Sequence, residues 1–132
     1  MTLTSVIPAL AAAAALLAGL VLATCDPTRL RGAWVVPASA SLLFAAFSAV
    51  AVALEGPVGF WPVHTANLWG NQVWIDLLIA ALVGFASLAP TARTLRMRPL
   101  SWLLLTLATG SIGLLAMAAR VLFLRERAAG SR

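Results

Sequence analysis

The chain has 132 residues, of which 62% are hydrophobic and only 10% are charged, and its formal net charge is +5. This composition is too apolar for a soluble domain of this size and indicates an integral membrane protein. All nine basic residues are arginines that stand at the ends of apolar runs, which indicates contact with lipid headgroups. Nucleic acid is excluded as a partner because no solvated basic face is predicted to carry it.

The apolar runs predict four transmembrane helices. A span needs about 20 apolar residues to cross about 30 Å of hydrocarbon. We predict these spans at residues 4–24, 33–54, 70–89 and 99–124. The expected fold is therefore an all-α, integral membrane four-helix bundle, one domain over residues 1–132, with short loops and one longer aromatic loop between the second and third helices.

Small residues recur every four positions on the first two predicted helices, and such stripes let helix backbones approach closely. They are Ala11, Ala15 and Gly19 on the first helix, and Ser41, Ala45, Ala49 and Ala53 on the second. They predict helix association, either between copies of this chain or with a larger membrane complex.

The loop over residues 55–72 is the longest connection, and Gly and Pro punctuate it. It combines aromatic anchors with polar groups: Trp61, His64, Asn67, Trp69 and Asn71. Trp commonly marks a membrane interface, so one interpretation is a surface loop held by its aromatic residues. The other is a functional loop, since long loops often carry binding residues.

Asp76 is an acid inside an otherwise apolar run. A carboxylate near the middle of a membrane costs about 2.5 to 3.5 kcal/mol, so it is usually buried in protein and paired. Asp76 shares a spacing of four with Ala80 and Gly84, which predicts that it lies on a close-packing face.

Helix rise predicts the neighbours of Asp76. On straight helices, Asp76 lies about 21 Å from the basic loop, level with Ser48 and with the cluster Thr109 to Gly113. Arg120 lies about 10 Å farther along, level with Glu55. The count therefore predicts hydroxyl partners for Asp76 and an ion pair between Glu55 and Arg120.

Two roles for Asp76 remain open. It fixes helix packing through hydrogen bonds, or it lines a cavity that binds a polar group of a lipophilic ligand or relays a proton. The predicted lining of that cavity is Asp76 with His64, Asn67, Asn71 and Glu55, beside Trp61 and Trp69.

Catalytic and metal templates are missing from the sequence, which has no HExxH, CxxC, phosphate loop or nucleophile elbow. Cys25 is the single cysteine and His64 the single histidine, so no metal and no cofactor is expected. These features favour a non-enzymatic protein.

The half from Ile75 onward resembles an uncharacterised family of small bacterial membrane proteins, a domain of unknown function. The matching motifs are Asp76-Leu77-Leu78, Arg96-Met97 and Leu124-Arg125-Glu126-Arg127. In the basic loop that family often has Gly where this chain has Arg96. The resemblance implies four helices and the bacterial plasma membrane, without an established activity.

Four crossings place five arginines on one side and four on the other, so the positive-inside rule predicts an outside N-terminus and an outside C-terminus. They are Arg29, Arg31, Arg93, Arg96 and Arg98 on the first side, and Arg120, Arg125, Arg127 and Arg132 on the second.

The sequence thus predicts a multi-pass protein of the lipid bilayer that acts by helix association, as a homo-oligomer or as an accessory subunit of a membrane complex. One alternative is a small carrier or lipophilic-ligand binder with its polar site around Asp76. Another is a membrane enzyme acting on an isoprenoid or lipid.

Overall fold

The computed structural model describes residues 3–26 and 31–130 and is built from helices joined by short turns. It divides into two compact units, Met1–Arg31 and Gly32–Arg132. Arg29 and Arg132, which entered the predicted topology, lie outside the described residues.

The first unit contains one long helix, α1, over Leu3–Thr24. Its segment Val6–Thr24 is long and apolar enough to cross a membrane. Side chains from Ile7 to Thr24 are exposed all around the helix, and a Cβ added to Gly19 would meet nothing within 4 Å. Within residues 3–26, the predicted first span therefore forms this single helix, and no second element there covers its small-residue stripe.

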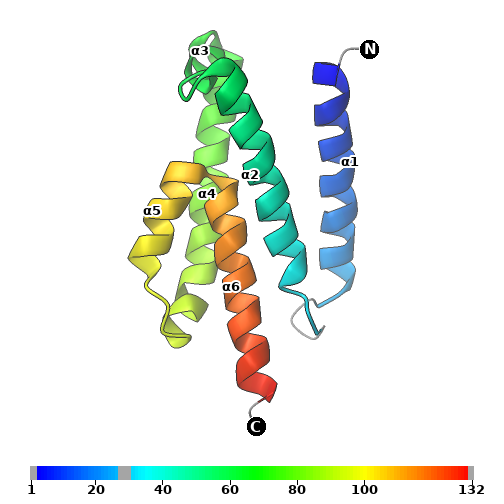
Figure 1. The fold of residues 1–132 in the computed structure, drawn as a ribbon, viewed down its shortest axis with the longest axis vertical. Coiled ribbons are helices and arrows are strands. Elements are labelled where there is room, and N and C mark those ends of the chain that lie inside the picture. The colour runs from blue at the N-terminus through cyan, green and yellow to red at the C-terminus, as the bar shows by residue number, and fades with distance from the viewer. Residues whose placement is uncertain (1–2, 27–30, 131–132) are drawn as a thin grey trace. The chain divides into compact units, whose positions relative to one another are not determined.

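Within residues 32–130, the second unit contains five helices: α2 (Val35–Glu55), α3 (Phe60–Thr65), α4 (Leu68–Thr94), α5 (Pro99–Thr109) and α6 (Ser111–Gly130). α6 lies at the centre and packs against α2, α4 and α5, while the short α3 packs on the start of α4 (Figure 1). Both α2 and α4 are long and apolar enough to span a membrane, whereas α5 is too short.

α2 runs antiparallel to α6, as two contacts at different heights show. The Oγ of Ser41 donates a hydrogen bond of 2.9 Å to the backbone oxygen of Ile112 near the start of α6. The ring of Trp34, just before α2, meets the ring of Phe123 edge-on at 5.4 Å, farther along α6. The small residue predicted at Ser41 is thus where the two helix backbones approach each other.

α4 runs in the same direction as α6, and the two share the buried core. Gly84 lies against Leu114, since a Cβ there would stand 2.6 Å from a methyl carbon of that leucine. Eight residues later, Ala92 packs with Met117 and Val121, all almost fully buried.

The predicted fourth helix is wrong as a single element, because the segment 99–124 folds into the antiparallel hairpin of α5 and α6 (Figure 1). Gly110 has φ +61, which a glycine adopts at no steric cost, and its N–H ends α5 by donating to the oxygen of Thr106. α6 then turns back, and Gly113 lies directly against the backbone of Leu105 and Thr106.

The third predicted helix extends at both ends. α4 begins at Leu68 and continues through Pro90 to Thr94, although residue 89 was the expected end. Pro90 removes only the N–H that would bond to the oxygen of Ala86, and the next turn of helix still closes. Inside the loop that precedes α4, residues 60–65 form the unexpected short helix α3.

Candidate functional site

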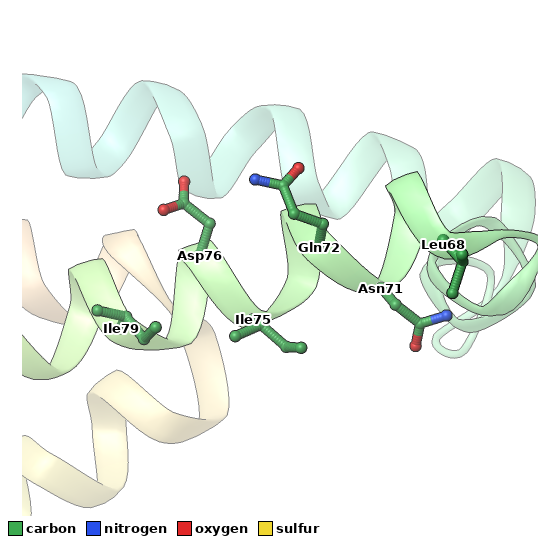
Figure 2. A pocket seen from close by; sticks show the side chains of 6 residues that line it. All are labelled: Leu68, Asn71, Gln72, Ile75, Asp76 and Ile79. Atoms are coloured by element: carbon green, nitrogen blue, oxygen red, sulfur yellow. The ribbon is translucent and has the colours of Figure 1, made fainter.

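A shallow open groove runs along α4 in the half nearer to α3, and its volume is about 360 Å³. It is lined by Leu68, Asn71, Gln72, Ile75, Asp76 and Ile79, all from α4 (Figure 2). These positions recur at intervals of three and four, so they form one stripe along the helix. The groove is therefore an unpartnered helix face, not a cleft between two elements.

Gln72 and Asp76 are the polar centre of this face. They lie one helical turn apart, and in Figure 2 their side chains extend to the same side of α4. Both are exposed, and neither makes a hydrogen bond or ion pair with another residue in 3–26 or 31–130. A carboxylate and a carboxamide thus stand open on an apolar helix, with acceptor and donor groups one turn apart.

Packing within the second unit covers only part of the face on which Asp76 was predicted to be buried. Gly84 contacts Leu114 of α6, whereas Ala80 and Asp76 are exposed. The physical reason is the turn at Gly110: α6 begins there, roughly level with residue 80 on α4, and leaves the rest of α4 without a neighbour from the hairpin.

The hydroxyls predicted to bond Asp76 are used elsewhere or lie apart from it. The Oγ1 of Thr109 donates to the backbone oxygen of Leu105 at 2.7 Å, within its own helix. Ser111 is exposed at the hairpin turn, and Ser48 is half-buried on α2. None of the three forms a hydrogen bond to Asp76.

The polar residues of the long loop shape the start of α4. The Oδ1 of Asn67 accepts a hydrogen bond of 2.9 Å from the N–H of Gly70, and this is an N-cap. Asn71 donates from its Nδ2 to the backbone oxygen of Asn67 at 3.1 Å, while it also lines the groove. Of the loop residues predicted around Asp76, only Asn71 lies in the same groove.

His64 belongs to an aromatic cluster on α3 and α4. Its ring lies 5.1 Å from the ring of Trp74 and 6.2 Å from that of Phe60, which in turn lies 5.5 Å from Trp74. Trp61 and Trp69 point outward and are 53% and 77% exposed. The cluster anchors α3 on α4, and the exposed tryptophans match the aromatic surface expected of an interface loop.

Glu55 and Arg120, predicted as an ion pair, lie toward opposite ends of the antiparallel helices α2 and α6. Ser41 is level with Ile112, and from there Glu55 is fourteen residues in one direction while Arg120 is eight residues in the other. Helix rise separates them by about 33 Å. The guanidinium of Arg120 lies instead 5.7 Å from the ring centre of Phe123.

The hairpin gathers the arginines of the second unit at one end, which we call the basic end. Its described arginines are Arg93, Arg96 and Arg98, around the end of α4 and the start of α5, and Arg120, Arg125 and Arg127, from the middle of α6 onward. The opposite end, with α3 and the aromatic cluster, has no arginine, because none occurs between residues 32 and 92. The unit is therefore strongly polarised in charge along its helices.

No group of three His, Cys, Asp or Glu side chains in the part of the chain that the structure describes could hold a metal ion. No family model, no curated protein and no solved structure matches the chain. The resemblance of the half from Ile75 onward remains an interpretation of the sequence.

Sequence reasoning missed Gln72 as a member of the polar face. The available signal was its spacing of four from Asp76, which places both side chains on one side of a helix. The sequence places Gln72 where the predicted loop (55–72) and the predicted helix (70–89) overlap, so its side of the helix was not assigned. In the structure α4 already includes it in its second turn.

Proposed function

We propose that this protein is a multi-pass membrane protein that acts by helix association, and that it pairs with a second copy of itself through the groove face of α4. The observation that carries this proposal is the pair of unsatisfied polar side chains, Gln72 and Asp76, on an apolar helix.

The depth of Asp76 makes it energetically costly to leave Asp76 and Gln72 facing lipid in a bilayer. Asp76 lies five residues from the middle of the span Leu68–Thr94, or about 8 Å along the helix. With about 15 Å of hydrocarbon on each side of the midplane, its carboxyl group falls inside the apolar layer. A polar group there is rarely left facing lipid and usually faces another helix.

The chemistry of the face suits a second copy. The carboxamide of Gln72 donates the hydrogen bonds that the carboxylate of Asp76 accepts. Two parallel copies of α4 packed through this stripe bring Gln72 of one chain within a turn of Asp76 of the other, twice, because a two-fold interface repeats each contact. Hydrogen bonds of this kind between membrane helices contribute about 0.6 to 2 kcal/mol each.

A lipophilic ligand is the less favoured occupant. Ligand pockets usually enclose most of a small molecule between several elements. All six residues that line this groove come from α4, so it covers one side of a bound molecule at most.

We also propose that the basic end faces the cytoplasm, since arginines near membrane ends favour that side. This orientation places the C-terminal end of α6 inside, in contrast to the outside C-terminus that four crossings predicted. The proposed orientation of α6 rests on the hairpin of α5 and α6, because this hairpin returns the chain to the side of the membrane where α4 ends.

Self-association is tested by energy transfer between labelled copies in liposomes at increasing lipid dilution. The change Asp76→Ala removes both hydrogen bonds, about 1.2 to 4 kcal/mol together, and is expected to raise the dissociation constant about tenfold or more. Leu77→Ala is the matched control, because Leu77 is exposed on the face of α4 opposite the groove and should leave the constant within about twofold. A wild-type chain that stays monomeric at every dilution would contradict the proposal, and a partner of different sequence would then be sought.

A further inference from the structure

Two arginines of α6 converge on one aromatic ring. The ζ-carbon of Arg127 lies 4.9 Å from the ring centre of Phe123, and that of Arg120 lies 5.7 Å from the same centre. The three residues share one helix face, at positions i, i+3 and i+7. Each cation lies within about 6 Å of the ring centre, a separation at which cation–π attraction operates.

Both guanidinium groups remain open to a ligand. Arg120 and Arg127 are exposed. The single acid of α6, Glu126, is already engaged, since its Oε2 accepts a hydrogen bond of 3.0 Å from the N–H of Gly32. Each guanidinium carries five N–H donors in a planar fork that fits phosphate oxygens.

The position of this face along the unit matches the headgroup region of a bilayer. Val121 packs with Ala92, so Arg120 is level with Arg93 where the span of α4 ends. The ring of Trp34 meets that of Phe123 at an angle of 81°, and tryptophan concentrates at membrane interfaces. This placement assumes insertion in a membrane but not self-association.

We propose that Arg120 and Arg127, held against Phe123, form a binding site for the phosphate group of an anionic phospholipid. The general charge of the basic end draws acidic lipids to this side. The paired guanidinium groups then add specific hydrogen bonds to one phosphate group, which charge attraction alone does not supply.

The test uses the full chain in detergent, with native mass spectrometry to titrate phosphatidylglycerol against phosphatidylcholine. Arg120→Gln and Arg127→Gln are each expected to weaken phosphatidylglycerol binding about tenfold. Arg125→Gln is the matched control: it removes the same charge from the same helix, but Arg125 lies roughly on the opposite face from Arg127. It should weaken binding less than about threefold.

Phe123→Leu tests the role of the ring, because leucine keeps apolar bulk beside Trp34 without an aromatic face. Its expected effect is a severalfold loss of phosphatidylglycerol binding with both arginines still present. If Arg125→Gln and Arg127→Gln weaken phosphatidylglycerol binding equally, the binding depends on general charge attraction and the proposed site is overturned. Binding of phosphatidylcholine as tight as that of phosphatidylglycerol would also overturn the choice of an anionic lipid.

A second experiment distinguishes a phospholipid ligand from a soluble phosphate ligand. Inorganic phosphate is added at millimolar concentration to the chain loaded with phosphatidylglycerol. Retention of the lipid supports the proposal, because the acyl chains add apolar contacts that the free anion lacks. Displacement of the lipid by inorganic phosphate would assign the site to a soluble anion instead.

Discussion

Gly113 of α6 lies against Thr106 of α5 so closely that a Cβ on the glycine would stand 2.8 Å from the amide nitrogen of the threonine. The obstacle is backbone, which cannot rotate away as a side chain does. We therefore predict that Gly113→Ala lowers the free energy of unfolding by about 1 to 3 kcal/mol, the usual cost of overpacking. Thermal unfolding in detergent, followed by circular dichroism, measures the change.

Gly19→Ala is the control for this substitution. Nothing lies within 4 Å of a Cβ at Gly19, and alanine favours a helix over glycine by about 0.5 to 1 kcal/mol. The control is expected to leave stability unchanged or raise it slightly. If Gly113→Ala behaves in the same way, α5 and α6 do not meet at this point.

Thr106 buries a hydroxyl group without a hydrogen-bond partner. The residue is 3% exposed, and its Oγ1 finds no donor or acceptor among the described residues. An unsatisfied buried polar group costs about 1 to 3 kcal/mol, and valine has nearly the same shape as threonine. We predict that Thr106→Val leaves the unfolding midpoint unchanged or raises it, whereas Thr106→Ala lowers it through the cavity that it leaves. A clearly lower unfolding midpoint for Thr106→Val would mean that the hydroxyl group forms a hydrogen bond in the membrane-bound protein.

The three long helices could be predicted from the sequence because their apolar runs are long and carry few charges. The hairpin could not. Residues 99–124 form an equally long apolar run, and glycine is common inside membrane helices, so Gly110 did not stand out as a turn. Helix rise instead predicts Thr109, Gly110 and Ser111 as polar neighbours of Asp76.

The prediction of residues 99–124 as one helix also gave Asp76 and Glu55 partners that they do not have in the structure. Counting helix rise assumes straight and continuous helices. Because the chain reverses at Gly110, Arg120 lies far from Glu55 and belongs to the basic end. Asn67 is the N-cap of α4, whereas the sequence predicts it in the loop, with the helix beginning at residue 70. The unused signal was asparagine just before an apolar run, which is a common start of a helix.

Arg96 has φ +56, a left-handed backbone conformation that favours glycine. It closes α4: its N–H donates to the oxygen of Arg93, and the N–H of Met97 donates to the oxygen of Ala92. This pattern is a Schellman motif, in which the residue at the position of Arg96 is usually glycine. We predict that Arg96→Gly raises the free energy of unfolding by about 1 kcal/mol, because a side chain in this conformation costs about 1 to 2 kcal/mol.

Chemical unfolding in detergent measures the effect of Arg96→Gly. The matched control is Arg98→Gly, which removes an arginine from the same loop at a residue with φ −93, where glycine relieves no strain. The control should lower stability slightly through the greater freedom of the unfolded chain. Equal effects of the two changes would show that charge, not backbone strain, governs this loop.

The reversal at Gly110 predicts on which side of the membrane each end of the second unit lies. Three single cysteines are introduced after Cys25→Ser: Val58→Cys beside α3, Thr94→Cys at the end of α4 and Ala129→Cys at the end of α6. In sealed vesicles of one orientation, an impermeant maleimide is expected to label residues 94 and 129 from the same side and residue 58 from the other. An α5–α6 segment that crossed the membrane as one span would place residue 129 with residue 58 instead. Labelling of all three cysteines after detergent lysis controls for reactivity, so the pattern in sealed vesicles decides between a hairpin and a fourth crossing.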